Sequence, residues 1–128
     1  MSVKDSIAKL LVDSDFTSCF TKPVSALLCG EPIVVGEGGF ERKSRLSEEE
    51  RGTVVATVLV VRDDAYEAGA VALAAEHVVR HANWEPYADA APYRIVDIDT
   101  TVPAYEGDDD TGRAVWSFKV TCTVVRGL

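Results

Sequence analysis

The 128-residue chain is acidic, with 21 aspartate and glutamate residues, 13 lysine and arginine residues and a net charge of −8. This length predicts a single domain spanning residues 1–128, and 47% hydrophobic with 27% charged residues is typical of a globular protein. The negative charge argues against binding to a nucleic-acid backbone, which needs clustered lysine and arginine. The apolar runs are too short for a membrane-spanning helix of roughly 20 residues, and residues 1–15 lack the basic region and apolar core of a secretion signal. We therefore expect no membrane association.

The first half of the chain predicts one helix and two strands. Residues 2–12 have apolar side chains at helical spacing, with Ser2 as the candidate N-cap and Asp5 three residues later. The sequence PIVVG at residues 32–36 predicts a strand, and residues 52–62, GTVVATVLVVR, form the strongest strand pattern in the chain. Because this second strand is apolar on both faces, we expect it at the centre of a sheet, with a helix on one face and another protein on the other.

Residues 36–51, GEGGFERKSRLSEEER, are predicted to form a flexible charged arm. The segment carries five acidic and four basic side chains, and its glycines lie at the front. No Gly-Lys-Ser or Gly-Lys-Thr follows these glycines, so the segment is not a phosphate-binding loop. We expect a long, mobile hairpin, which is compatible with an arm that orders on binding a partner. Its candidate contact residues are Phe40, Arg42, Lys43 and Arg45.

The second half predicts a long helix followed by two strands. Residues 65–82 place alanine and valine along one helical face, and Asp63 or Asp64 can cap the start. Residues 93–102 and 113–126 alternate as strands, and the acidic turn between them should close an antiparallel hairpin. The resulting order, α-β-β-α-β-β, predicts an α+β fold with a four-stranded, mostly antiparallel sheet and two helices on one face.

Acidic residues dominate residues 95–112, which cover the second half of the strand predicted at 93–102 and the turn after it. They are Asp97, Asp99, Glu106, Asp108, Asp109 and Asp110. A solvated acidic turn, a surface facing a polyanion or basic partner, and a cation site all remain open, although the spacing does not match a calcium-binding EF-hand. Asp97 and Asp99 share a strand face and could act as an acid–base pair, but the sequence offers no nucleophile near them. We therefore expect no enzymatic activity, no metal and no cofactor.

His77 and His81 lie four residues apart on the long helix, the spacing of two zinc ligands. The glutamate of a zinc-protease motif is missing between them, so we expect a helix flank or a subunit contact. Trp84 and Tyr87 follow the helix and suit either the core edge or a subunit interface. The three cysteines, Cys19, Cys29 and Cys122, form no CxxC pair, which favours reduced cysteines in the core.

The order of these elements resembles the phage tail terminator and minor capsid (head-tail joining) protein families of prophages. The matching pieces are the charged arm at residues 36–51, the strand at 52–62 leading into DDAYEAGAVALAAEHV, and the closing strand RAVWSFKVTCTVVR. The match spans nearly the whole chain and is a pattern of elements.

The resemblance implies a non-enzymatic virion assembly protein that forms a homo-oligomeric ring, typically of six copies, at the tail end or the head-tail junction. Its partners would be tail-tube and head-completion proteins, and DNA would pass through without specific binding. It would be found in the virion tail, and in the cytoplasm of the bacterial host during assembly. The alternative is a small intracellular module that binds a protein partner.

Overall fold

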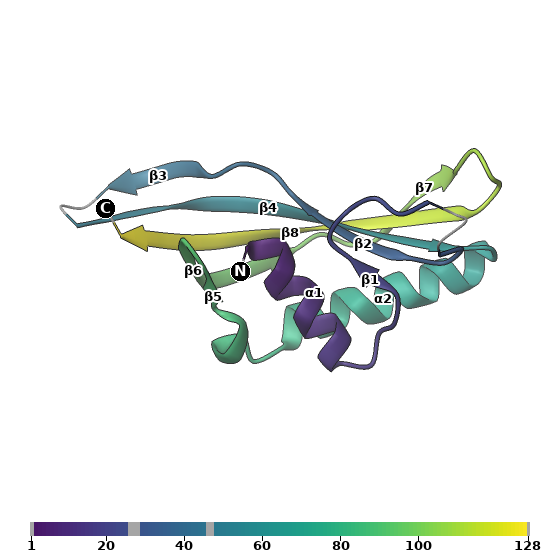
Figure 1. Ribbon diagram of the computed structural model, residues 1–128, viewed down its shortest axis with the longest axis horizontal. Helices are drawn as coiled ribbons and strands as arrows, with labels where there is room; N and C mark the ends of the chain where they lie inside the picture. The colour runs from purple at the N-terminus through teal and green to yellow at the C-terminus, as the bar shows by residue number, and fades with distance from the viewer. Residues whose placement is uncertain (1, 26–28, 46–47, 128) are drawn as a thin grey trace.

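The computed structural model describes residues 2–25, 29–45 and 48–127. Two helices lie on one side of a long, curled sheet (Figure 1). The elements in chain order are α1 Val3–Asp13, β1 Cys19–Phe20, β2 Ile33–Glu37, β3 Glu41–Arg45, β4 Glu49–Arg62, α2 Ala65–His81, the 3-10 helix η1 Glu85–Tyr87, β5 Asp89–Ala90, β6 Tyr93–Thr100, β7 Ala104–Asp108 and β8 Ala114–Gly127.

The strands β4 and β8 form the centre of the sheet. They pair antiparallel along all 14 residues of each strand, from Glu49 opposite Gly127 to Arg62 opposite Ala114. The strand order is β1-β2-β4-β8-β6-β5, while β3 also pairs with β4 and β7 also pairs with β8. All of these pairs are antiparallel except β1 with β2, which is parallel. The expected central position of residues 52–62 is therefore confirmed.

The predicted four-stranded sheet with the order α-β-β-α-β-β is wrong, because the described residues form one mixed sheet of eight strands. Each strand that flanks the central pair is interrupted. Gly38 and Gly39 separate β2 from β3, and residues 101–103 separate β6 from β7, where Pro103 has no N–H to donate to a neighbouring strand. Two strands of only two residues, β1 and β5, add to the count. The predicted turn at residues 103–112 therefore begins with a strand, β7.

Both helices begin where their capping residues predict. In α1, the Ser2 hydroxyl accepts a hydrogen bond from the Asp5 amide and the Asp5 carboxylate accepts one from the Ser2 amide, at 3.3 and 3.1 Å. In α2, the Asp64 side chain accepts a hydrogen bond from the amide of Tyr66 at 3.1 Å. The predicted cap of α1 is therefore confirmed, and of the two candidates for α2, Asp63 and Asp64, the second is the cap.

The core lies between the helices and one face of the sheet. The side chains on the buried face of α2 are small. A Cβ built on Gly69 would come within 2.9 Å of Cζ2 of Trp116, so the helix lies directly on β8. The alternation predicted for residues 113–126 is confirmed by an inward-facing row of side chains in β8. Its buried members are Ala114, Phe118, Val120, Cys122 and Val124, with Trp116 half-buried.

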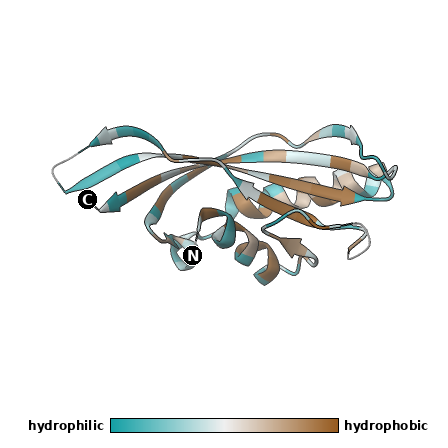
Figure 2. Ribbon diagram, turned by 45° about the horizontal axis from the view of Figure 1, so that its top comes forward, coloured by the Kyte–Doolittle hydropathy of each residue, from teal (hydrophilic) through white to brown (hydrophobic). Residues whose placement is uncertain are grey.

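The other face of the sheet carries no helix within the described residues. In β4 the buried residues alternate with Thr53, Val55, Thr57 and Leu59, which point to this open face, and Val55 is 38% exposed. Figure 2 shows hydrophobic residues along the middle of the sheet and hydrophilic ones at the end formed by β3 and the start of β4. Neither helix in the described ranges has the length and apolar character needed to cross a membrane.

The charged arm of residues 36–51 is a hairpin formed by β3 and the first residues of β4. Glu41 lies opposite Thr53 and Arg45 lies opposite Glu50, with a bulge between Arg42 and Ser44. Figure 1 shows this hairpin extending past the helices, next to the end of β8. Residues 46–47 of the predicted arm lie outside the described residues, and the flexibility of the arm stays a prediction.

Candidate assembly surface

An aromatic and charged cluster holds the base of the arm against the sheet. Phe40, just before β3, stacks on Tyr93 at the start of β6, with ring centroids 5.2 Å apart and an interplanar angle of 17°. The guanidinium of Arg126 lies 4.5 Å from the Phe40 centroid and 5.8 Å from that of Tyr93. The two rings come from opposite sides of the central strands. Phe40, predicted as a partner contact, is therefore used within the chain.

Gly52 of β4 allows Phe40 to take this position. A Cβ on Gly52 would lie 2.7 Å from ring atoms of Phe40 and 2.2 Å from the carbonyl oxygen of Glu41. Any larger residue would push the ring and the start of β3 away from the sheet. The glycine therefore serves the packing of the arm.

A buried carboxylate completes the cluster. Glu50 is 5% exposed, and Arg126 donates to its Oε2 from Nε at 2.8 Å, with Nη2 2.7 Å away. Arg42 Nη1 lies 3.5 Å from the other carboxylate oxygen. The hydrogen bond from Arg126 is the main cause that lowers the pKa of Glu50, and the same bond raises the pKa of Arg126. Arg42 therefore already has an ion-pair partner within the chain and is less available to another protein.

The strand β3 presents a basic edge to solvent. All five of its residues are exposed, and they include three basic side chains and one acidic one. Lys43 Nζ lies 2.7 Å from Glu41 Oε1. Arg45 has no ion-pair partner within residues 2–25, 29–45 and 48–127. Of the predicted arm contacts, Lys43 and Arg45 are thus the most available to a partner.

Three of the predicted acidic residues lie on β6 and β7, which are on the other side of the central strands from β3. Asp97 and Asp99 of β6 are exposed, and they are paired with Thr123 and Thr121 of β8, so both point to the open face. A bulge between Ile95 and Asp97 turns Ile95 inward while the two carboxylates stay outward. Glu106 of β7 accepts a hydrogen bond from the Ser117 hydroxyl.

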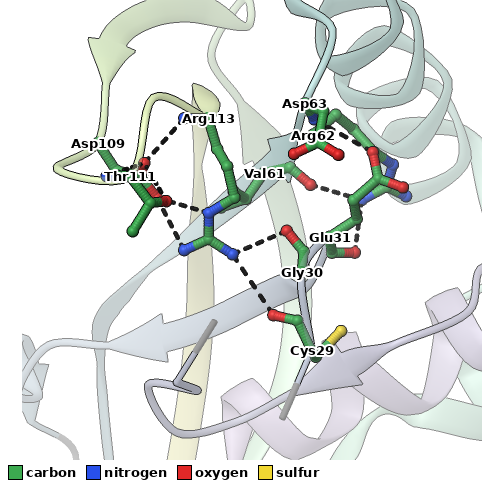
Figure 3. Close-up of polar contacts among 9 residues, drawn as sticks. All are labelled: Cys29, Gly30, Glu31, Val61, Arg62, Asp63, Asp109, Thr111 and Arg113. Atoms are coloured by element: carbon green, nitrogen blue, oxygen red, sulfur yellow. Dashed lines mark hydrogen bonds and ion pairs between the residues drawn. The ribbon is translucent and has the colours of Figure 1, made fainter. Parts of the chain in front are cut away.

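The remaining acids lie in the β7–β8 turn, and most of them are used there. Asp109 accepts hydrogen bonds from the Thr111 amide and hydroxyl and the Arg113 amide at 2.8–3.0 Å, and its Oδ2 lies 2.7 Å from Arg113 Nη2 (Figure 3). Burial acts to raise the pKa of Asp109, but these hydrogen bonds outweigh it and lower the pKa to about 2. Asp108 accepts from the Tyr105 hydroxyl at 2.6 Å. Among the described residues, Asp110 has no such bond.

Two arginines that the sequence analysis did not single out tie the loop before β2 to the sheet. Arg113 Nη1 donates to the Gly30 carbonyl oxygen at 2.7 Å, and Arg62 Nη1 donates to the carbonyl oxygens of Glu31 and Val61, both at 2.8 Å (Figure 3). Glu31 in turn accepts from the amide of Asp63 at 3.1 Å. The only sequence signal was the position of each arginine at the end of an apolar strand. The acidic turn is therefore mainly an anchor and not an open acidic site.

The predicted contact residues around α2 divide into two kinds. His77 and His81 are exposed, with ring centroids 4.4 Å apart. Trp84 is half-buried and donates from Nε1 to the Val79 carbonyl oxygen at 2.9 Å, while the Tyr87 hydroxyl donates to Asp13 at 2.8 Å. Trp84 and Tyr87 therefore lie at the core edge, where they join η1 to the helices.

Cysteine and metal chemistry give no candidate site in the described part of the chain. No group of three or more histidine, cysteine, aspartate or glutamate side chains could hold a metal ion there. All three cysteines are free. Cys122 is buried as predicted, and burial raises the pKa of its thiol to about 12, whereas Cys19 and Cys29 are half-buried.

An open groove of about 510 Å³ runs between the end of α2 and the outer edge of β6. Its lining includes the apolar residues Ala82, Trp84, Val96 and Ile98, with Arg80 and Glu85 among its charged members. β5 pairs only with the first two residues of β6, so residues 96–100 have no neighbouring strand on this side in the described structure. The groove therefore borders a strand edge that has no strand neighbour within the described residues.

No family model and no curated protein matches the sequence. The fold is similar to that of a chain in a solved structure described as the virion of a native gene transfer agent (GTA) particle, with a TM-score of 0.57 and 12% sequence identity. The similarity covers 97% of this chain and 95% of that chain. The two chains therefore share a fold over nearly their whole lengths.

Proposed function

We propose that this chain is a non-enzymatic structural protein of a virion. The observation that carries this proposal is the similarity of its fold, over 97% of its length, to a chain of the GTA virion particle. Because a shared fold alone does not transfer a function, the surfaces of this chain must supply independent support. The open sheet face and the free strand edges are such surfaces.

The open face of the sheet supports assembly. Val55 and Leu59 of β4 lie among threonines on a face that no described helix covers, and Val55 is 38% exposed. Antiparallel sheets tolerate one solvated face, so this face is stable in water. It still offers valine, leucine and threonine side chains to another protein. A structural role in a multi-subunit particle uses such a surface.

The finer part of the proposal is a homo-oligomeric ring at the tail end or head-tail junction, in contact with tail-tube and head-completion proteins. Free strand edges lie on opposite sides of the sheet, at β3 and at β6, and contacts between unlike surfaces of identical subunits produce rings when they close. The net charge of −8 would also keep DNA from adhering as it passes through such a ring.

Sedimentation velocity of the purified chain over a wide concentration range, combined with negative-stain microscopy, tests this proposal. We expect a species several times heavier than the 13.8 kDa monomer, together with ring-shaped class averages. A strict monomer at every accessible concentration would contradict the ring.

The groove beside β6 favours a second candidate function, a small module that binds one extended segment of another protein. Its apolar lining of Ala82, Trp84, Val96 and Ile98 suits alternate side chains of such a segment. In this case the chain stays monomeric in the same sedimentation experiment, so one measurement separates the two candidates.

A further inference from the structure

We propose that copies of this chain join by strand addition, with β3 of one copy pairing antiparallel to the free segment of β6, residues 96–100, of the next copy. The inference rests on the self-association proposed above and identifies the two surfaces that carry it.

Both strands have an open backbone edge. One side of β4 is fully occupied by β8, so β3 pairs on the other side, at one edge of the sheet. β6 pairs with β8 at the opposite edge, and β5 covers only Tyr93 and Arg94. An exposed edge presents unpaired amide and carbonyl groups, which a strand of another chain can satisfy. Each copy therefore has two different free edges, and the β3 edge of one copy can pair with the β6 edge of the next.

The directions of these strands allow the more favourable kind of pairing. β3 runs antiparallel to β4, β4 antiparallel to β8, and β8 antiparallel to β6, so β3 and β6 run in opposite directions. When a second copy continues the sheet side by side, its β3 therefore lies antiparallel to β6 of the first. No inversion of one copy is needed.

The charges of the two edges are complementary. β3 carries Arg42, Lys43 and Arg45 against one glutamate, on a chain whose net charge is −8. Residues 96–100, VDIDT, carry Asp97 and Asp99 and no basic residue. Lysine residues and a bulge on an edge strand commonly block unselective strand pairing. Here the positive charges disfavour pairing of β3 with β3 of another copy, whereas the acidic edge of β6 favours pairing with β3. Asp97 and Asp99 point to the open face, whereas Arg42 and Arg45 lie on the helix-facing side, so the two strands attract through their net charges and not through direct side-chain pairs.

The groove adds a place for side chains. Register places Arg45 opposite Glu50, on the helix-facing side of the sheet, which is also the side where α2 borders the groove. Arg45 has no ion-pair partner in the described structure, and the groove offers Trp84 for stacking and Glu85 for charge pairing. We expect Arg45 to enter the groove of the neighbouring copy.

Register also predicts how neighbouring copies are offset. β3 lies level with residues 123–126 of β8, whereas the free part of β6 lies level with residues 120–123. Pairing therefore shifts each copy along the strand direction by about three residues, or roughly 10 Å. A closed ring with this shift needs strands inclined to the ring axis, as in a barrel.

Charge reversal tests the pairing. Arg45→Glu, and separately Glu85→Arg, should each raise the apparent dissociation constant of the oligomer by about tenfold or more, because like charges then meet in the groove. Combining both substitutions in one chain, or mixing the two single variants, should restore association. Lys22→Glu, at an exposed position in the loop after β1, changes the net charge as much as Arg45→Glu and should leave association unchanged.

Hydrogen exchange of the unaltered protein gives a second measurement that does not depend on how the variants fold. Backbone amides in residues 41–45 and 96–100 should gain protection as the concentration rises into the oligomeric range. An oligomer that forms without this protection, and that neither reversal weakens, overturns the strand pairing while leaving the proposed function intact. A strict monomer overturns both the strand pairing and the proposed ring.

Discussion

Arg126 and Glu50 form an ion pair across β8 and β4, with 2.7 Å between Nη2 and Oε2, and Glu50 is only 5% exposed. The pair lies at the base of the arm, where the same arginine also covers the rings of Phe40 and Tyr93. It links the last strand of the chain to the hairpin that carries the basic edge. The shape of that edge therefore depends on a contact between residues 76 positions apart.

Glu50→Gln should destabilise the protein, because Arg126 loses its charged partner while the shape of the side chain at position 50 is kept. We expect the thermal midpoint to fall by about 5 °C. Glu49→Gln is the matched control, since the adjacent residue makes no ion pair in the described structure. Equal midpoints for the two variants in scanning calorimetry would contradict a stabilising role of the pair.

Gly52→Ala should loosen the arm. The added Cβ would lie 2.2 Å from a backbone oxygen and 2.7 Å from the Phe40 ring, so we expect a loss of about 1–3 kcal/mol in the free energy of unfolding. Gly36→Ala, in β2, meets no atom within 4 Å and should be neutral or slightly stabilising. Urea unfolding of both variants measures the difference, and a Gly52 variant as stable as the Gly36 variant would refute the packing argument.

Asp109→Asn should change stability in a pH-dependent way. The folded pKa of about 2 lies below the ordinary value of 3.8, so the ionised carboxylate stabilises the fold above about pH 4, and this contribution is lost as the pH falls towards 2. The variant should therefore have a lower urea midpoint than the unaltered protein at pH 6, and the gap should shrink in acid. Asp110→Asn, next to it and exposed, should show no such gap. A gap that stays constant with pH would count against the turn network.

His77→Ala with His81→Ala tests whether the exposed flank of α2 is a subunit contact. Both side chains are exposed, so stability should change by less than about 0.5 kcal/mol. Because we assign association to β3 and β6, sedimentation velocity should show the same oligomer for the variant. A loss of association would move the interface to α2.

Local patterns predicted the parts of the fold that depend on nearby residues. Ser2 and Asp5 form their capping box within one helical turn, and the alternation of β8 marked its buried face from Ala114 to Val124. The sequence also identified β4 as central, since its apolar residues are continuous. Each of these features is decided by the spacing of residues along one element.

The features that were missed depend on contacts between distant residues. Gly38 and Gly39 were seen as the start of an arm, but only pairing with β4 shows that they divide one edge into β2 and β3. Asp109 was predicted as part of an acidic surface, and its bonds to Arg113 make it an anchor instead. The groove beside β6 needs α2 and β6 to meet in space, so no sequence spacing reveals it.

Immunogold labelling of purified particles from the source strain, with peptides of this chain identified in the same particles by mass spectrometry, is the most direct test of the central claim. We predict stoichiometric peptides of the chain and gold at a single position, at the tail end or the head-tail junction. Particles that contain no peptide of this chain, or that carry no gold at either position, would contradict its assignment as a structural protein of the virion.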